Sequence, residues 1–188
     1  MKPTVICHMT ASVDGRTLPS RWSPKTNSAS DLYERIHERL AGDGWLVGRV
    51  TGADFSKRGA YDAPAPAPIP RENWIAEQGA AQYAVIIDAH GKIAWGRSDI
   101  GGDPIVVALS RAVSDQHLAG LRADNVSYVF AGERDVDLKE ALDVLNRELG
   151  VRRILLEGGG HINGAFLKAG LIDELSLIIQ PAVDGKPG

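Results

Sequence analysis

The chain has 188 residues, 44% hydrophobic and 24% charged, which is typical of a folded soluble protein and excludes disordered and collagen-like classes. This length fits one domain spanning residues 1–188. The net charge of −3 at pH 7 gives no basic surface for nucleic acid, so we expect a small-molecule partner.

Cysteine and histidine content narrows the classes further. Cys7 is the single cysteine and cannot form an internal disulfide, and no signal peptide or membrane-length apolar run appears, so we expect a cytoplasmic protein without a membrane partner. One cysteine cannot build a multi-cysteine zinc site, and the five histidines show no HExxH spacing. We therefore expect no metal.

The first third of the chain predicts a strand, a helix and a second strand. Residues 4–12 begin with β-branched and apolar residues and end at the turn signal Asp14-Gly15. Residues 28–44 predict a helix that Ser30 or Asp31 caps and that ends at the glycines 42 and 44. Its apolar face carries Leu32, Ile36 and Leu40. Residues 45–48 predict a short buried strand.

Residues 56–82 differ from the rest. The stretch "DAPAPAPIP" alternates proline with small residues, which favours an extended, solvated backbone and excludes a helix interior or a central strand. We expect a long surface excursion, either a spacer or a lid over a substrate, since long loops in compact domains serve both roles.

The remaining chain alternates short apolar runs with helical patterns. Strands are predicted at 83–88, 104–110, 126–130, 152–157 and 174–183. Helices are predicted at 113–121, 138–149 and 162–170, the second of them closed by Gly150.

This alternation predicts a mostly parallel sheet covered by helices on both faces. Ligands of such sheets bind at the carboxyl ends of the strands. Three features fall at predicted strand ends: Asp14-Gly15, residues 48–51 and the glycine triplet 158–160.

The triplet directly precedes a predicted helix. Bare N–H groups at a helix N-terminus favour phosphate, and without side chains a pyrophosphate can approach the main chain closely. The alternative is a tight turn or close strand-to-helix packing. Ser110 and Arg111 offer a hydroxyl and a guanidinium that suit the 2′-phosphate of NADPH, or are a cap serine beside a solvated arginine. Thr51 is a phosphate ligand or an ordinary N-cap.

Five stretches together resemble a known family. They are "TASVDGRT" (10–17), "SRW" (20–22), "VGRVTGAD" (47–54), "VVALSR" (106–111) and "LLEGGGHINGAFLKAGLIDELSLIIQP" (155–181). In this order they resemble the reductase domain of bacterial riboflavin biosynthesis, the partner of the diaminohydroxyphosphoribosylaminopyrimidine deaminase. That domain is itself similar to dihydrofolate reductase.

The resemblance implies a three-layer α/β/α fold of the dihydrofolate-reductase type, with a central, mostly parallel sheet and an antiparallel C-terminal strand. It implies NADPH as hydride donor, a homodimer, and reduction of 5-amino-6-(5-phosphoribosylamino)uracil to the ribitylamino compound. Other hypotheses are a reductase of a different pterin or pyrimidine, including dihydrofolate, and a non-catalytic NADPH-binding protein.

The resemblance also implies roles for individual residues. Substrate would meet Ser20, Arg39 and Glu157. Glu157 would orient the substrate or relay a proton, or simply accept backbone hydrogen bonds, and Asp14 is an acid catalyst or a structural turn aspartate. The cofactor would contact Ala11, Trp22, Thr51, Asp54, Ser110, Arg111, Gly159, Gly160, His161, Ile162, Asn163, Gly164 and Ala165.

Two regions depart from the family pattern. After Asp54 the family continues into a substrate loop with an arginine for the ribose phosphate, whereas this chain has "FSKRGAYDAPAPAPIPRENW", in which Lys57, Arg58 or Arg71 would substitute. After "PAVDGKPG" family members usually add a hairpin to the sheet.

Overall fold

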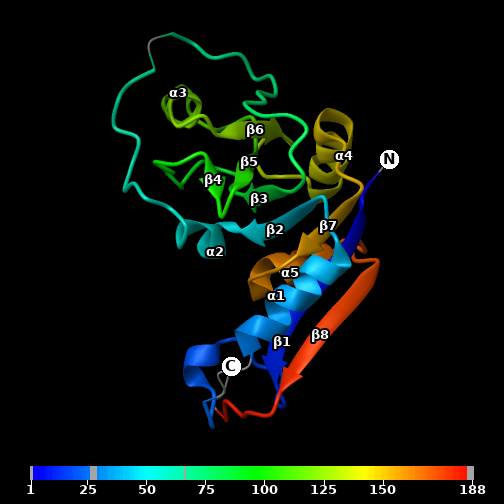
Figure 1. Ribbon diagram of the computed structural model, residues 1–188. Coiled ribbons are helices and arrows are strands. Elements are labelled where there is room, and N and C mark those ends of the chain that lie inside the picture. Colours follow the sequence, from blue (N-terminus) through cyan, green and yellow to red (C-terminus); the bar gives the residue numbers. More distant parts are fainter. Residues whose placement is uncertain (1, 26–28, 66, 186–188) are drawn as a thin grey trace.

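The fold is built on one eight-stranded sheet (Figure 1). The computed structural model describes residues 2–25, 29–65 and 67–185. The strands run in the order β4-β5-β3-β2-β7-β1-β8, and β6 also pairs with β5. They are β1 (Thr4–Ser12), β2 (Gly44–Gly48), β3 (Tyr83–Ile87), β4 (Asp99–Ile100), β5 (Asp103–Leu109), β6 (Ser127–Phe130), β7 (Arg153–Leu156) and β8 (Glu174–Gln180).

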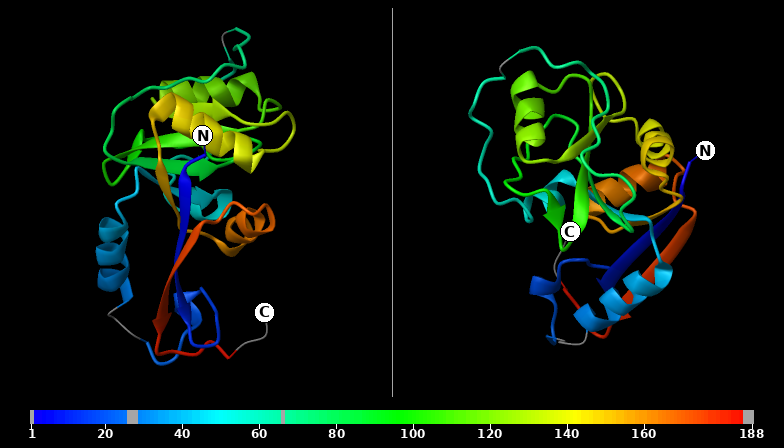
Figure 2. Two further views of the ribbon diagram at one scale, coloured as in Figure 1. Left: turned by 90° about the vertical axis from the view of Figure 1, so that its right-hand side faces the viewer. Right: turned by 45° about the horizontal axis from the view of Figure 1, so that its top comes forward.

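Helices cover both faces of this sheet, as predicted. One buried cluster joins the sheet to α4 and α5 through Leu142, Leu145 and Phe166, and the other joins it to α3 through Leu118 and Leu121. Figure 2 shows α1 and α5 on opposite sides of the sheet. The helices are α1 (Ala29–Leu40), α2 (Arg49–Ala53), α3 (Asp115–Ala123), α4 (Leu138–Leu149) and α5 (Gly160–Lys168), with a 3-10 turn, η1 (Pro19–Arg21). The three-layer arrangement is confirmed.

The helix predicted most clearly, α4, has the predicted bounds. Asp137 accepts a hydrogen bond from the N–H of Glu140 at its start, and Gly150 ends it with φ of 71°, a conformation that glycine adopts without steric cost. Its apolar side chains enter one core cluster. Local signals and packing therefore agree over this segment.

The predicted antiparallel C-terminal strand is wrong. β8 pairs with β1 in parallel, from Ile6 opposite Glu174 to Ser12 opposite Gln180. The cause is α5, which returns the chain across the sheet so that β8 starts at the same end as β7. The antiparallel pair lies instead between β4 and β5, two strands joined by a tight turn.

Two short elements and one helix start also differ from the prediction. The sequence analysis did not foresee α2 or the two-residue strand β4. Helix α1 begins at Ala29, so Ser30 and Asp31 lie in its first turn and are not its N-cap. Residue 28 lies outside the described residues.

The excursion of residues 56–82 has no helix or strand in its described part and arches around α3 (Figure 1). It is anchored: Trp74 and Tyr128 exchange two main-chain hydrogen bonds of 2.9 Å, and the Tyr61 hydroxyl donates to Asp124 at 2.8 Å. Arg71 pairs with Asp115. The excursion therefore covers the β6 side of the sheet.

Within the described ranges, no helix is both long and apolar enough to cross a membrane.

Candidate functional site

Two turns meet at the carboxyl ends of β2 and β7. These strands pair in parallel, and main-chain bonds continue the pairing past the strand ends: the Glu157 N–H donates to Leu46 O and the Gly48 N–H donates to Gly158 O, both at 2.9 Å. The turn after β2 and the glycine turn after β7 are therefore held side by side. Both had been predicted to lie at a ligand-binding edge.

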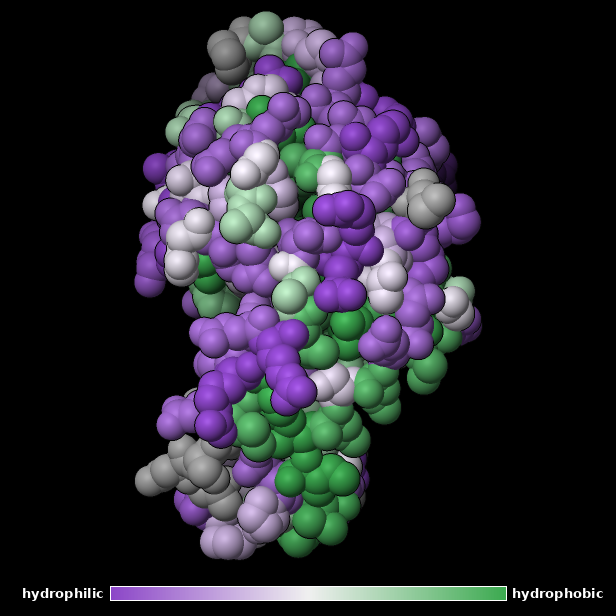
Figure 3. Space-filling view, turned by 45° about the vertical axis from the view of Figure 1, so that its right-hand side comes forward, coloured by the Kyte–Doolittle hydropathy of each residue, from purple (hydrophilic) through white to green (hydrophobic). Residues whose placement is uncertain are grey.

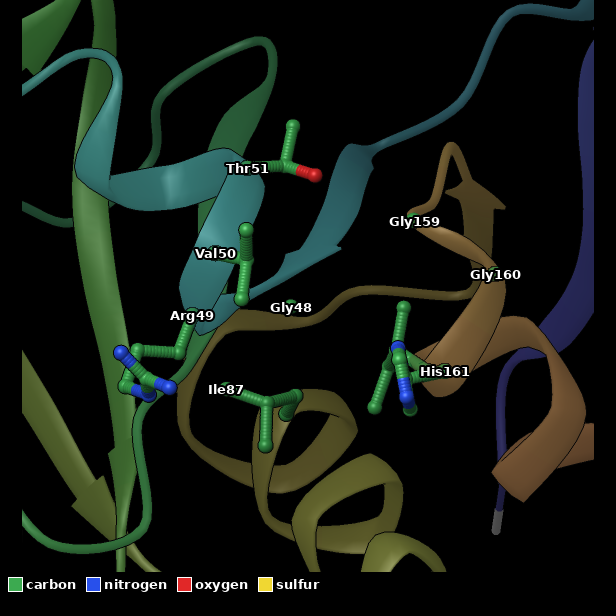
Figure 4. A pocket seen from close by; sticks show the side chains of 9 residues that line it. Gly48, Arg49, Val50, Thr51, Ile87, Gly159, Gly160 and His161 are labelled. Atoms are coloured by element: carbon green, nitrogen blue, oxygen red, sulfur yellow. The ribbon is translucent and has the colours of Figure 1, made fainter. Parts of the chain in front are cut away.

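A cavity of about 580 Å³ lies between these turns, which we call the glycine pocket. Its size is within the range of small-molecule sites. In Figure 4 the starts of α2 and α5 face each other across it, and Val50 and His161 reach in from opposite sides. It is lined by Gly48, Arg49, Val50, Thr51, Ile87, Gly159, Gly160, His161 and Ile162.

The three glycines at 158–160 are needed for different structural reasons. Gly158 has φ of 104°, which side chains disfavour, and a Cβ there would lie 3.3 Å from the Met9 sulfur. Gly159 is the extended N-cap of α5, and a Cβ on Gly160 would meet nothing within 4 Å. The tight-turn hypothesis thus applies to Gly158, while Gly159 and Gly160 present open main chain to the cavity.

The glycine pocket is suited to an anion. Helix α5 has nine residues, no side-chain cap and no acidic residue in its first turn, so its first N–H groups carry the positive end of the helix dipole. Arg49, exposed at the rim, adds a full charge. The free N–H groups of α5 fit a dinucleotide diphosphate lying along the turn.

A second cavity of about 360 Å³, the acidic pocket, adjoins the first. Thr51 lines both cavities. The acidic pocket is lined by Tyr33, Glu34, His37, Trp45, Val47, Thr51, Phe55, Ile100, Asp103 and Glu157. Three of these residues carry carboxyl groups, and His37 is the one basic side chain among them.

His37 links α1 to the glycine turn. Its Nδ1 lies 2.7 Å from Glu157 Oε1, and its Nε2 lies 3.2 Å from Gln82 Oε1. The Glu157 interaction raises the pKa of His37 to about 9, against a smaller opposing effect of burial. The imidazole of His37 is therefore charged at neutral pH.

Other side chains of the acidic pocket are fixed as well. Trp45 Nε1 donates to Asp103 Oδ2 at 2.8 Å. Burial and the neighbouring Glu157 raise the pKa of Tyr33 far above its usual range, so its phenol is neutral and can donate a hydrogen bond. The lining thus offers several acceptors and few cations, which suits a ligand rich in N–H and O–H groups.

Six of the residues predicted for the site line the two cavities. Glu157 lies in the acidic pocket, and Thr51, Gly159, Gly160, His161 and Ile162 lie in the glycine pocket. Thr51 is inside α2, whose N-cap is Gly48, so the N-cap alternative for Thr51 is wrong. Asn163, Gly164 and Ala165 follow within α5 but are not among the lining residues.

Asp14 lies in the turn after β1 and lines neither cavity. It accepts hydrogen bonds from Ser12 Oγ at 2.6 Å and from the main-chain N–H groups of Asp184 and Gly185 at 3.1 and 3.0 Å. These donors hold the pKa of the Asp14 carboxyl well below its usual range. An acid catalyst must carry a proton, so this environment favours the structural alternative.

Ser110 and Arg111 follow β5, as predicted, but do not face a cavity together. Ser110 is fully buried and its hydroxyl donates to Ala89 O at 2.7 Å. Arg111 donates to Arg71 O at 2.7 Å and pairs with Glu133 at 3.3 Å. A phosphate at this position would have to displace these partners.

The other predicted residues lie outside the cavity linings. Ala11 and Trp22 are buried, and Asp54 is the exposed C-cap of α2. Ser20 and Arg39 are exposed. The candidates for a phosphate-binding cation, Lys57, Arg58 and Arg71, line neither cavity.

His37 and Tyr33 are the functional candidates that the sequence analysis missed. They lie four residues apart on α1 and so share one helix face. A histidine and a tyrosine on one face of a helix were the sequence signal that could have identified them. Arg49 lies in the stretch 47–54, and the sequence analysis predicted no role for it.

Among the described residues, no group of three or more His, Cys, Asp or Glu side chains is placed to hold a metal ion.

The sequence profile of the RibD C-terminal domain matches residues 3–188. A 2,5-diamino-6-ribosylamino-4(3H)-pyrimidinone 5′-phosphate reductase of Methanothermobacter thermautotrophicus is 28% identical over 187 residues, covering 98% of this chain and 81% of the relative. The enzyme of the same name from Archaeoglobus fulgidus is 26% identical over 200 residues, covering 98% and 83%.

Solved structures show the same fold. The riboflavin biosynthesis reductase Rib7 of Saccharomyces cerevisiae superposes with a TM-score of 0.63 at 19% identity, covering 98% of this chain and 76% of that one. A pyrimidine reductase-like protein of Corynebacterium diphtheriae gives 0.64 at 19%, covering 96% and 75%. The recognised fold and family are confirmed.

Replacing Gly158→Ala should lower the free energy of unfolding by about 1–3 kcal/mol, because the positive φ and the close Met9 sulfur both oppose a side chain. Denaturant unfolding measures this change. Gly164→Ala is the matched control: a Cβ there meets nothing within 4 Å, so stability should stay equal or rise slightly. Equal stability of the two variants would contradict the requirement for glycine at 158.

Proposed function

The chain belongs to the RibD C-terminal domain family, and from this premise we propose that it is a nicotinamide-dependent reductase of riboflavin biosynthesis. Its substrate would be a phosphoribosylaminopyrimidine, and its product the corresponding ribitylamino compound. The compartment that fits this role is the cytoplasm.

The observation that carries the proposal is the junction of two cavities at Thr51. One cavity has main-chain donors for a diphosphate, and the other has acceptors for a polar heterocycle. Hydride transfer needs two ligands held in contact, and most of the rate gain in such a reaction comes from their alignment. A cofactor-binding protein without catalysis would not need the second, acidic cavity.

The chemistry needs little beyond binding from the protein. When the ribosylamine ring opens, the nitrogen lone pair forms a C1′=N bond as the C1′–O4′ bond breaks, and the electron pair left on O4′ takes a proton from water. The residues of the glycine pocket would hold a nicotinamide dinucleotide, which would supply a hydride to C1′ as the C=N electron pair returns to nitrogen. Glu157, in the acidic pocket next to the glycine turn, can stabilise the positive charge of the C=N group with its carboxylate.

The substituent at position 2 of the pyrimidine ring distinguishes two possible substrates. The names of the archaeal relatives specify a 2,5-diamino-4-pyrimidinone, whereas the substrate first expected, 5-amino-6-(5-phosphoribosylamino)uracil, has an oxygen at position 2. An amino group there adds a hydrogen-bond donor. Because Glu34, Asp103 and Glu157 supply acceptors to the acidic pocket, we propose the diamino ring as the preferred substrate.

NADPH is the proposed cofactor, and Arg49 supports it. Arg49 lines the glycine pocket, whereas Ser110 and Arg111 are engaged by protein groups. A guanidinium is well suited to a phosphomonoester such as the 2′-phosphate. We therefore assign the recognition of that phosphate to Arg49 in place of Ser110 and Arg111.

A homodimer is also part of the proposal. β8 is last in the sheet order and exposes Leu175, Leu177 and Ile179 on one face, with 67%, 46% and 64% of each residue accessible. Figure 3 shows apolar side chains gathered over this part of the molecule. A monomer rarely leaves such a patch uncovered, and a second copy supplies an apolar surface of the same kind.

The function is tested by NADPH oxidation, followed by absorbance, with each pyrimidine in turn. We expect turnover of the diamino compound, slower turnover of the uracil, and none of dihydrofolate. Glu157→Gln should lower kcat by about 100-fold or more, because it removes the carboxylate charge beside the reacting carbon. Tight NADPH binding without oxidation in the presence of either pyrimidine would overturn the proposal.

Arg49→Gln should raise the KM for NADPH about tenfold and leave that for NADH nearly unchanged, because only NADPH carries the 2′-phosphate. Initial rates with both cofactors measure the effect. The control is Arg111→Gln, for which we expect no change in the NADPH to NADH ratio. If Arg111→Gln alone abolished the preference, the original assignment to Ser110 and Arg111 would be correct.

The dimer is tested by sedimentation equilibrium. The double variant Leu175→Lys and Ile179→Lys should weaken association by about 100-fold or more, since it places unpaired charges in an apolar interface. Leu167→Lys, on an equally exposed leucine of α5, should leave association unchanged. A wild-type chain that stays monomeric at high concentration would contradict the proposal.

A further inference from the structure

His37 is the one basic side chain among the residues that line the acidic pocket, and both of its ring nitrogens face oxygen acceptors. Gln82 Nε2 donates to Gly42 O at 3.2 Å, which turns the amide so that its oxygen faces His37 Nε2. Glu157 Oε1 lies 2.7 Å from His37 Nδ1 and accepts a hydrogen bond from it. A neutral imidazole has one N–H, so it can satisfy only one of these acceptors, whereas an imidazolium satisfies both.

The surroundings of His37 also favour the charged form. Glu157 at the end of β7 contributes most to raising its pKa to about 9, and Glu34 on α1 contributes as well, against the effect of burial. The other titratable groups nearby are Asp103 across the acidic pocket, the neutral Tyr33 on the same helix, and His8 and Cys7 on β1 behind it. None of these groups is a lysine or an arginine.

We propose that His37 is a positioning residue, which as an imidazolium fixes the Glu157 carboxylate in the acidic pocket, next to the glycine turn, and so makes turnover depend on its own proton. This inference rests on the proposed reductase function. His37 acts through Glu157, because both of its N–H groups are engaged by the protein and neither remains for a ligand.

The geometry around Glu157 explains why the hydrogen bond from His37 can orient its carboxylate. Glu157 is the last residue before the glycine turn, and its main-chain N–H is tied to Leu46 O. Its backbone is therefore fixed, while its side chain, 11% exposed, accepts its shortest hydrogen bond from His37 and has Tyr33 as a second neighbour. Loss of the His37 proton leaves one N–H for two acceptors, so either Glu157 or Gln82 loses its donor.

The pH dependence follows from the direction of the pKa change. The pKa of His37 is raised from 6.5 to about 9, so His37 is an imidazolium at neutral pH and loses its proton as pH rises through about 9. The stability that the pair of His37 and Glu157 adds to the folded state disappears over the same interval. We expect kcat to fall along this limb.

The first experiment is an NMR titration of the histidine ring signals in the full chain. His37 should titrate near pH 9 in the wild type and return toward 6.5 in Glu157→Gln. His90, an exposed histidine outside both cavities, is the internal reference. A wild-type His37 that titrates near 6.5, or one that Glu157→Gln does not change, overturns the proposal whatever the activity.

The second experiment compares pH profiles of kcat for the wild type, His37→Leu, His37→Asn and His90→Gln. His37→Leu should lose about 100-fold in kcat, because a carboxylate that is misplaced by about 1 Å aligns the substrate poorly. Asn places a neutral donor near the Nδ1 position, so His37→Asn should recover part of this loss and show no fall near pH 9. His90→Gln should match the wild type.

The outcomes of the two experiments separate the inference from the proposed function. An alkaline limb that persists unchanged in His37→Asn contradicts the role of the His37 proton in turnover. A wild-type chain that reduces neither pyrimidine contradicts the reductase function, and the ring titration still decides whether the ion pair exists.

Discussion

The site depends on the parallel pairing of β2 with β7 and on its continuation past the strand ends. Two main-chain hydrogen bonds, from Glu157 to Leu46 and from Gly48 to Gly158, join segments more than a hundred residues apart in the chain. They fix the start of α2 opposite the start of α5, and the glycine pocket is the space between them. Because these bonds use only backbone atoms, the side chains of the two turns remain available for ligands.

The sequence was most informative where local signals and tertiary packing coincide. The period and caps of α4 and the strand-glycine-helix order at 154–168 predicted those elements and the ligand edge. The direction of β8 followed from the path of the chain through α5, and the resemblance gave it incorrectly. His37 was missed because its importance arises from Glu157 and Gln82, which are 120 and 45 residues away. No local pattern encodes such a meeting.

The strands β6 and β8 differ in how their outer edges are covered. At β6, Trp74 of the proline-rich excursion pairs with Tyr128 and satisfies main-chain groups that an edge strand would otherwise expose. At β8, within the described residues, no strand pairs with the outer side, and apolar side chains remain exposed. The chain thus protects one side with its own segment and leaves the other suited to association.

The anchoring of residues 56–82 allows the length of this loop to change without moving the residues that line the two cavities. Between Tyr61 and Trp74, the described part of this segment contacts α3 and β6 and lines neither cavity, whereas Gln82 at its end contacts His37. Adding residues to a surface loop costs little conformational entropy, since doubling its length costs about 0.6 kcal/mol. The segment between its anchors at Tyr61 and Trp74 can therefore lengthen or shorten over evolution while the reacting groups stay in place, and it is a natural position for grafting a foreign peptide onto this scaffold.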